Sequence, residues 1–359
     1  MPSRSHRKSR AGIVEIASQL RVSPSMVSRA LRPETAHLVR ADRRKLIVDL
    51  AEKLHFSPNP GARILRQGAN ASLAVVVPLD ENIFFSEFYG RFLSGTLHAA
   101  AARSWDVQIC ALRRTPGSDF RGALQQLGLA TSGLIYLAEP LAAAEVRQLR
   151  DYRRPLVLTK SALPPGIAVG DAGVPVVGVD NLEGARAAAS LLLQLGHRRI
   201  GLLMGPPTSR DSIERRQGYL EVLDRAGCRP SSGWIYEGAF SAQTGRDGIA
   251  AMLAKPDRPT AICCASDEIA FGAIDGARAA GLRCPEDISI VGFDDGPWAN
   301  ACRPALTTVR QPLADLAERA VGLIVEAANR AGRPGYVQQV SEMPASIVIR
   351  ESTQVAPAG

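Results

Sequence analysis

The sequence predicts a multidomain chain in which a small all-α headpiece precedes a larger α/β core, whose two lobes are each built on a parallel, doubly wound sheet. Three observations support this fold class. Helical patterns fill the first 56 residues, the excess positive charge is confined to the same part of the chain, and apolar strand-like runs alternate with helix-length segments after Ala71. A chain of 359 residues, 46% of them hydrophobic and 22% charged, is long enough for two or three globular domains.

Two short helices joined by a tight turn are expected at the start of the headpiece. Apolar residues at helical spacing predict the first over about 13–20, and Arg21 interrupts the pattern. Ser23 is expected to cap the second helix, over about 24–31, because a serine hydroxyl can accept a hydrogen bond from the first turn. Pro24 fits the first helical position, where its missing backbone N–H would have no helical partner. This helix would turn four side chains outward: Ser25, Met26, Ser28 and Arg29. Such a pair suits the major groove of DNA, but an ordinary helical hairpin of a small α domain fits these residues equally well.

The distribution of charge separates these two interpretations. Residues 1–68 contain 14 Lys and Arg against 5 Asp and Glu, so this segment carries the whole excess of the chain's net charge of +8 and the remaining 291 residues have a net charge of −1. A solvated helical face does not require such segregation, whereas the neutralisation of phosphates does. A nucleic-acid partner is therefore favoured.

A third helix, expected over about 41–54, would complete a headpiece that spans residues 1–56. Residues 57–69 are then expected to form a linker with a short hinge helix, in which Asn59 is the N-cap and Pro60 the first helical residue. Because isolated helices shorter than about 12–15 residues are marginal in water, this helix should order only when it packs against something. A plain interdomain linker is the alternative.

The rest of the chain, residues 70–359, is expected to form the core. The predicted strands are 73–78, 107–111, 133–137, 156–159, 174–179, 200–204, 261–264 and 288–292. Continuous apolar strands with helices between them are typical of parallel sheets, which bind ligands at the carboxyl ends of their strands. We expect one lobe over about 70–173 and 303–335, and the other over about 174–302 and 336–355.

Several function classes find no support in these residues. No apolar run approaches the roughly 18–20 residues of a membrane span, and the basic N-terminus is not followed by an apolar signal core, so we expect a cytoplasmic protein without a membrane partner. The six cysteines form no Cys-x-x-Cys pair, and we expect neither a metal nor a cofactor. Asp294, Asp295 and His197 invite an enzymatic interpretation, but no nucleophile, base and orienting group emerge together, and no catalytic residue is predicted.

Eight short motifs, in this order and spacing, resemble the lactose-repressor (LacI/GalR) family of bacterial transcription regulators. They are Val22-Ser-Pro-Ser-Met-Val-Ser-Arg-Ala-Leu31, Ser57-Pro-Asn59 with Ala62-Arg-Ile-Leu65, Leu195-Gly-His-Arg-Arg-Ile200, Glu214-Arg-Arg-Gln-Gly-Tyr219, Ser266-Asp-Glu-Ile-Ala270, Val291-Gly-Phe-Asp-Asp295, Leu306-Thr-Thr-Val-Arg-Gln-Pro312 and Arg350-Glu-Ser352. The resemblance implies a helix-turn-helix DNA-binding headpiece, a hinge helix, and a two-lobed core similar to periplasmic sugar-binding proteins. The chain departs from the family at Arg21, where glycine is usual, and at Arg40, where a Ser or Thr cap is usual.

The resemblance also implies a homodimer that binds double-stranded DNA at a pseudopalindromic operator, with the second headpiece helix in the major groove. Pro24, Ser25 and Arg29 match the positions that face bases, and Arg29 is suited to guanine or a phosphate. Leu65 falls where the family inserts a leucine pair into the minor groove and kinks the DNA. The residues implied to contact DNA are Ser23, Pro24, Ser25, Ser28, Arg29, Asn59, Ala62, Arg63 and Leu65.

The same resemblance implies a small-molecule effector in a cleft between the two lobes. The matching residues are Phe84, Phe85, Lys160, Asp211, Arg215, Phe240, Ser266 and Asp294. Asp294 would accept hydrogen bonds from ligand hydroxyls or an amine, although turn residues after a strand are the alternative for Asp294 and its neighbour. Lys160 stands where the family often has Asp or Asn, and together with Arg215 it suggests an anionic ligand such as a sugar acid or a phosphorylated sugar.

The function expected from these features is that of a sequence-specific DNA-binding transcriptional repressor whose operator affinity is switched by a sugar or sugar acid. The alternative is a solute-binding or sugar-receptor protein with no role on DNA. The basic headpiece and the missing signal peptide argue against this alternative.

Overall fold

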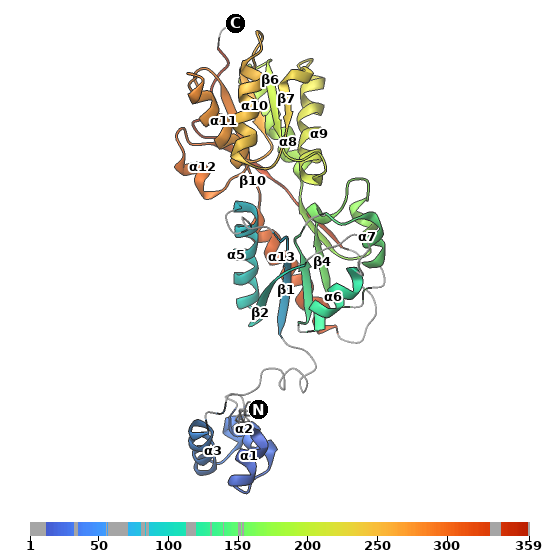
Figure 1. Ribbon diagram of the computed structural model, residues 1–359, viewed down its shortest axis with the longest axis vertical. Helices are drawn as coiled ribbons and strands as arrows, with labels where there is room; N and C mark the ends of the chain where they lie inside the picture. The colour runs from blue at the N-terminus through green and yellow to red at the C-terminus, as the bar shows by residue number, and fades with distance from the viewer. Residues whose placement is uncertain are drawn as a thin grey trace, which may run out of the picture. The chain divides into compact units, whose positions relative to one another are not determined.

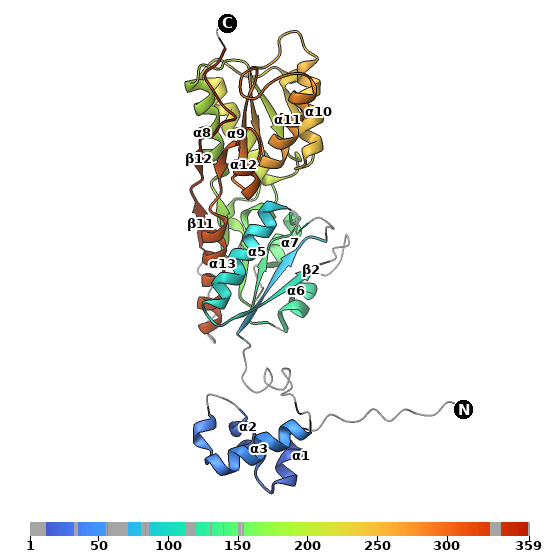
Figure 2. The same cartoon turned by 90° about the vertical axis from the view of Figure 1, so that its left-hand side faces the viewer.

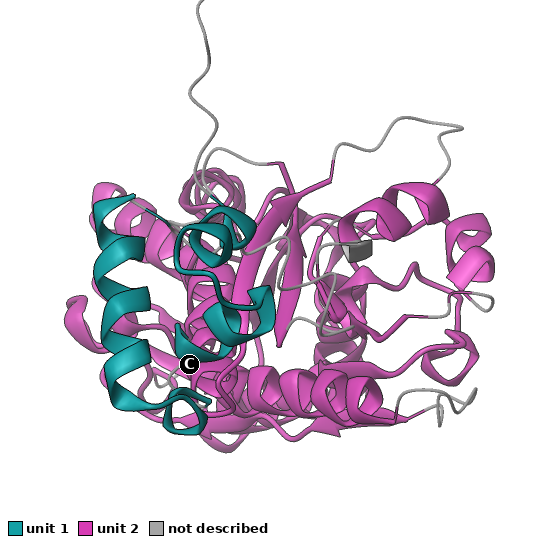
Figure 3. Cartoon of the chain, turned by 90° about the horizontal axis from the view of Figure 1, so that it is seen from below, with its two compact units in different colours: residues 1–69 teal, residues 70–359 magenta. Residues whose placement is uncertain are grey.

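The chain divides into two compact units, Met1–Ala69 and Asn70–Gly359 (Figure 3). The computed structural model describes residues 12–357 apart from 32–34, 55, 57–70, 80–82, 84–85, 113–119, 130, 139, 150–151, 153 and 331–338. No helix in this described part is long and apolar enough to cross a membrane.

The first unit is a small helical domain. Its elements are α1 (Ile13–Gln19), α2 (Pro24–Ala30), the 3₁₀ turn η1 (Ala36–Leu38) and α3 (Ala41–Lys53). The helices share one apolar core made by Ile16, Ala17, Val27, Ala30, Ile47 and Ala51. The three helices predicted from the sequence are therefore confirmed, with ends that differ by a single residue.

The turn between α1 and α2 is held by local chemistry. Ser23 caps α2, since its hydroxyl accepts a hydrogen bond from the backbone N–H of Met26 at 3.2 Å, and Pro24 is the first helical residue. Arg21 has φ = 51°, in the left-handed region that favours glycine. An L side chain there costs on the order of 1 kcal/mol, so the departure from glycine at this position is a real strain.

The second unit contains two six-stranded sheets, and we call the parts built on them the N-lobe and the C-lobe (Figure 1). The N-lobe sheet has the order β11 (Val340–Met343), β5 (Val176–Val179), β4 (Leu156–Thr159), β3 (Gly133–Tyr136), β1 (Ser72–Val77) and β2 (Asp106–Ala111). The C-lobe sheet has the order β12 (Ser346–Val348), β10 (Thr307–Arg310), β9 (Ser289–Asp294), β8 (Ala261–Cys264), β6 (Ile200–Met204) and β7 (Ile235–Glu237). All neighbouring strands are parallel except β10 and β12. The central strands are buried on both faces, as their continuous apolar runs predict.

Helices cover both faces of each sheet. In the N-lobe these are α5 (Glu87–Ala101), α6 (Phe120–Leu129), α7 (Ala143–Leu149) and α13 (Leu313–Asn329). The pair α5 and α13 lies on one face and α6 and α7 on the other (Figure 2). In the C-lobe the helices are α8 (Asn181–Gln194), α9 (Arg210–Arg225), α10 (Ala242–Leu253), α11 (Asp267–Ala279) and the short α12 (Pro297–Ala301). α5 and α13 approach closely because Gly95 has no Cβ, which would lie 2.9 Å from the Cβ of Ala317.

The predicted division into lobes needs correction at three places. Strand β5, placed in the second lobe from its sequence, pairs with β4 and β11 of the N-lobe. Strand β10 was expected in the first lobe and pairs with β9 of the C-lobe, whereas β11 was expected in the second lobe and belongs to the N-lobe. An apolar run specifies that a strand is buried but not which sheet it joins, so these crossings were not readable from the pattern.

Candidate DNA-binding helix and effector site

The outer face of α2 carries the residues predicted to contact DNA. Ser23, Pro24, Ser25 and Arg29 are exposed and Ser28 is half-buried, whereas Val27 faces the core. The hydroxyls of Ser23 and Ser25 lie 2.9 Å apart. This face therefore combines hydroxyl groups with one guanidinium, which are groups that suit phosphates and base edges.

Six predicted contact residues lie outside the described residues. They are Asn59, Ala62, Arg63 and Leu65 of the linker, and Phe84 and Phe85 of the cleft. Their proposed roles stay predictions.

Four of the predicted effector residues lie where strands of the two sheets end. Lys160 follows β4 directly, Asp211 and Arg215 lie in the first turns of α9 after β6, and Asp294 is the last residue of β9. Asn181, which the sequence did not single out, begins α8 after β5 and links this group. The carboxyl ends of parallel strands thus bring these polar side chains together, as is usual for ligand sites in such sheets.

Arg215 is fixed at the centre of the group. Its Nε donates to Asn181 Oδ1 at 2.9 Å and its Nη1 donates to the carbonyl oxygen of Ala265 at 2.6 Å. Its guanidinium carbon lies 3.8 Å from the centre of the Phe293 ring, and its Nη1 lies 3.8 Å from Asp294 Oδ1. With 3% of its surface exposed, Arg215 is a rigid donor rather than a mobile surface cation.

Lys160 is also buried, and two carboxylates surround its ammonium group. Its Nζ lies 2.9 Å from Glu214 Oε2 and 2.5 Å from Glu342 Oε1. Burial opposes the charge of Lys160, but the hydrogen bonds to Glu342 and Glu214 outweigh burial and raise its pKa above the ordinary value. Lys160 therefore ties η2 (Lys160–Ala162) and β11 of the N-lobe to α9 of the C-lobe, and its charge is already balanced inside the protein.

The two aspartates of the group are held by amides and a cation. Asn181 Nδ2 donates to Asp211 Oδ1 at 2.9 Å, and Gln311 Nε2 donates to Asp294 Oδ1. Burial raises the pKa of Asp211, with the charge of Arg215 opposing the rise. Burial likewise raises the pKa of Asp294 to about 6, against the opposing effects of Arg215 and Gln311. Both carboxyls therefore take up a proton more readily than solvated aspartates do.

Ser266 and Phe240 occupy the ends of two further C-lobe strands. Ser266 follows β8 and caps α11, since its hydroxyl accepts a hydrogen bond from the N–H of Ile269 at 3.2 Å. Phe240 is half-buried, and its ring lies so close to Gly205 that a Cβ there would be 2.3 Å from ring atom Cε1. Each residue has a structural task at this edge of the C-lobe sheet, which the sequence reasoning did not anticipate.

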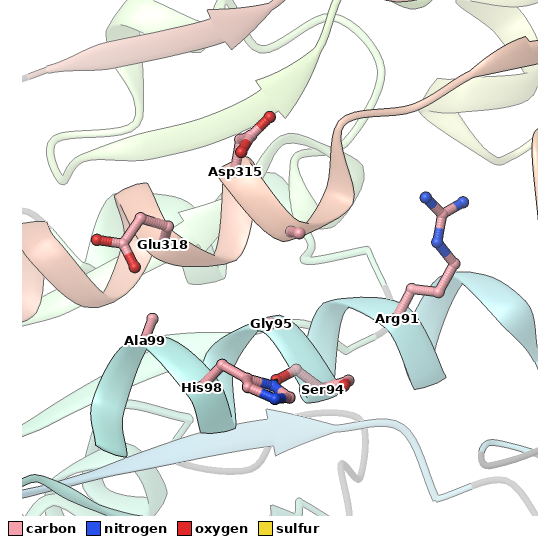
Figure 4. A pocket seen from close by; sticks show the side chains of 8 residues that line it. Arg91, Ser94, Gly95, His98, Ala99, Asp315 and Glu318 are labelled. Atoms are coloured by element: carbon pink, nitrogen blue, oxygen red, sulfur yellow. The ribbon is translucent and has the colours of Figure 1, made fainter. Parts of the chain in front are cut away.

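Residues that the sequence reasoning missed complete the group. Asn181, Glu214, Gln311 and Glu342 each bond to one of the predicted side chains. A signal existed for Asn181, because it follows shortly after the apolar strand β5, whereas Gln311 follows β10, whose sequence Thr-Thr-Val-Arg has no apolar run. A separate groove between α5 and α13 (Figure 4) contains none of the described effector residues.

His197 is distant from this chemistry in role and position. It precedes β6 at the amino end of the C-lobe sheet and is fully buried, with its ring nitrogens 3.0 Å from Thr260 Oγ1 and 3.1 Å from Ser289 Oγ. Burial lowers its pKa. His197 therefore connects strand ends, whereas Asp294 lies at the opposite end of the same sheet.

Comparison with known proteins supports the sequence motifs. A family described as periplasmic binding protein-like domain matches residues 189–353. The repressor CytR of Escherichia coli (strain K12) is 30% identical over 352 residues, covering 97% of each chain, and the repressor PurR of Mannheimia succiniciproducens is 27% identical over 350 residues, covering 96% of this chain and 99% of PurR. The structure of the lac repressor dimer bound to operator and the anti-inducer ONPF has the same fold, with a TM-score of 0.81 and 24% identity over 96% of this chain and all of the other. The predicted family is thereby confirmed: the chain belongs to the LacI family of helix-turn-helix transcriptional repressors and is a DNA-binding regulator.

Proposed function

We propose that the chain is an effector-switched repressor that binds a pseudopalindromic operator as a homodimer. The observation that carries this proposal is that the chain has two separate polar features, one exposed and one buried. One is an exposed face of α2, with Ser25 and Arg29, on a segment that holds all the excess positive charge. The other is a buried polar group between the lobes, centred on Arg215 and Asp294. The solved structure described as the lac repressor dimer bound to operator and the anti-inducer ONPF has the same fold.

In this proposal residues 1–56 form the DNA-binding headpiece and residues 57–69 the hinge. Arg29 reads a base, and Ser23 and Ser28 contact phosphates. Asn59, Ala62 and Arg63 belong to a hinge helix that forms on DNA, and Leu65 enters the minor groove. A regulator of this kind works beside the bacterial chromosome, which supports a cytoplasmic location.

The effector is a polyhydroxylated small molecule bound by Asp211, Arg215 and Asp294, with Phe240 and Ser266 at the rim. Both cations expected to attract an anion already have partners: Lys160 lies between Glu214 and Glu342, and Arg215 faces Asp294. An added carboxylate or phosphate would meet these acidic groups without an unpaired cation to balance it. A neutral sugar is therefore favoured over the sugar acid that Lys160 suggested from its sequence position.

The alternative of a solute receptor with no role on DNA is tested by DNA binding itself. The full chain is used to select duplexes from a random pool, and binding of the selected duplex is measured at increasing salt. We expect a pseudopalindromic site and an affinity that falls by about 10³-fold or more between 50 and 200 mM salt. Failure to select any sequence contradicts the proposal.

Matched sugars test the effector. Calorimetric titration compares D-glucose with D-glucuronate and D-ribose with ribose 5-phosphate. We expect binding of neutral members only, and an acidic member that binds more tightly than its neutral partner contradicts the assignment of Lys160 as an internal tie.

A substitution in the hinge tests the proposed switch. Leu65→Ala should weaken specific binding while the headpiece stays folded, because the lost apolar wedge acts only on the kinked operator. Unchanged specific affinity contradicts the hinge mechanism.

A further inference from the structure

Two side chains, one helical turn apart on α5 of the N-lobe, contact the C-lobe loop that carries Asp294. Arg91 Nη1 donates hydrogen bonds to the backbone carbonyl oxygens of Asp294 and Asp295, both at 2.9 Å. Glu87 Oε1 accepts a hydrogen bond from the backbone N–H of Trp298 at 3.4 Å. The start of α5 and the short helix α12 lie side by side in Figures 1 and 2. We call residues 294–298 the corner.

The corner has an unusual backbone. Asp294 has φ = 138° and Asp295 has φ = 55°, and non-glycine residues held in such regions cost on the order of 1–3 kcal/mol each. The corner must therefore be held by its surroundings. From the C-lobe, Asp267 donates its N–H to Asp294 Oδ2 at 3.4 Å and accepts from the N–H of Gly296 at 3.1 Å. From the N-lobe, Arg91 holds the two carbonyls that these torsions orient.

The approach of Glu87 depends on a glycine. A Cβ on Gly296 would lie 1.2 Å from Glu87 Oε2, so no other residue type fits while the carboxylate is there. Burial raises the pKa of Glu87, with the hydrogen bond from Trp298 opposing the rise. Glu87 is thus packed against the corner rather than extended into solvent.

We infer that Arg91 and Glu87 are positioning residues through which the state of the effector site reaches α5. Arg91 binds carbonyl oxygens, whose directions depend on the backbone torsions of Asp294 and Asp295. A ligand that engages the Asp294 carboxylate acts on the same residue from the cleft side. A corner that relaxes on ligand binding withdraws both acceptors from Arg91 and frees α5 from the C-lobe, which is a two-state change that ligand binding biases.

The residue that follows the C-cap of α5 offers a matched control. Arg103, just beyond the last turn of α5, pairs with Glu318 of α13, with 2.5 Å between Nη2 and Oε1. This ion pair joins two elements of the N-lobe and does not cross between lobes. Figure 4 shows Arg91 at the opposite end of the groove from Ala99, and the carbonyl oxygen of Ala99 accepts a hydrogen bond from Arg103 Nη1 at 2.9 Å, so Arg103 acts at the other end of α5 from Arg91. Arg103→Met therefore removes an arginine contact of α5 without touching the corner.

The inference rests on the proposed function for its consequence on DNA, and the experiment separates the two. The full chain is labelled with 5-fluorotryptophan, and the ¹⁹F resonance of Trp298 is assigned from Trp298→Phe. Arg91→Met should shift or broaden the Trp298 resonance and change affinity for the selected operator at least fivefold, while Arg103→Met does neither. Arg91→Lys keeps a positively charged donor group but not the guanidinium geometry, so its effects on the resonance and on affinity should lie between those of the native chain and Arg91→Met. This variant remains informative if the methionine variant unfolds.

An unchanged Trp298 resonance in Arg91→Met contradicts the role of Arg91 in holding the corner. A shifted resonance with operator affinity within twofold of native contradicts the transmission. A native chain that selects no operator overturns the proposed function, and with it the effect on DNA, while the Trp298 resonance still decides whether α5 holds the corner.

Discussion

Asp294 and Asp295 are adjacent in the chain, yet their carboxylates are held in opposite electrostatic settings. Burial raises the pKa of Asp294 to about 6, although Arg215 Nη1 lies 3.8 Å from its Oδ1. Asp295 is also buried, but Arg310 Nε at 2.6 Å and Arg350 Nη2 at 2.5 Å outweigh burial and lower its pKa below the usual range. In the corner, Asp294 is therefore a cleft carboxyl that takes up a proton readily, whereas Asp295 stays ionised inside the C-lobe.

This difference predicts opposite pH dependences. The folded-state pKa of Asp294 lies above its unfolded value, so its contribution to stability is present below about pH 4 and is lost as pH rises through about 6. The loss is on the order of 3 kcal/mol. Asp294→Asn should flatten the fall in the free energy of unfolding between pH 4 and 7, measured by chemical denaturation against the native chain. Asp295 has a lowered pKa, so it stabilises the native chain above its unfolded pKa and this contribution is lost as pH falls; Asp295→Asn should remove the contribution. If the free energy of unfolding depends on pH with the same slope in both variants, the opposite pKa shifts of Asp294 and Asp295 are contradicted.

Removing the cation between the lobes should be costly. Lys160→Met leaves Glu342 without this partner, while Glu214 keeps Arg210, whose Nε lies 2.9 Å from Glu214 Oε1. Breaking a buried ion pair costs about 3–5 kcal/mol, and we expect about 2–4 kcal/mol here because one carboxylate stays paired. Denaturant unfolding measures the change. The double variant with Glu342→Gln should recover part of the loss, and a Lys160→Met chain as stable as the native one contradicts the role of Lys160.

The strained turn of the headpiece predicts a substitution that raises stability instead of lowering it. Arg21→Gly should stabilise the headpiece by about 1 kcal/mol, because glycine adopts φ = 51° without the Cβ penalty. Amide hydrogen exchange of α1 and α2 in the full chain measures this gain. Arg44→Gly, at an exposed position inside α3, should lose about 1 kcal/mol, and a loss in both variants rules out strain at Arg21.

The outer face of α2 predicts how two basic residues differ on DNA. Arg29→Ala should weaken binding of the selected operator by about 1–3 kcal/mol and relax sequence preference at one base pair. Lys45→Ala, exposed on α3, should weaken all duplexes alike and reduce the salt dependence. Fluorescence anisotropy with the operator and its single-base variants measures both effects. A uniform loss in Arg29→Ala assigns Arg29 to the backbone instead.

The features predicted well from the sequence are those set by residues close together in the chain. Ser23 and Pro24 mark the start of α2, and the apolar runs mark the strands. The partners of Lys160 were missed because Glu342 is distant in sequence and becomes a neighbour only through the pairing of β11 with β5. Lys160, at a position where the family often has Asp or Asn, therefore suggested an anionic ligand together with Arg215, whereas the folded chain balances its charge internally.

The three crossings between the lobes also govern how the core is made. Helix α13 and strand β11 complete the N-lobe, yet both follow nearly the whole C-lobe in the chain. During synthesis the N-lobe sheet therefore cannot be completed until β11 has been made, near the end of the chain. The C-lobe sheet cannot be completed until β12, which follows β11, has been made. Such interleaving makes the contacts that complete each lobe distant in sequence, and contacts distant in sequence slow folding.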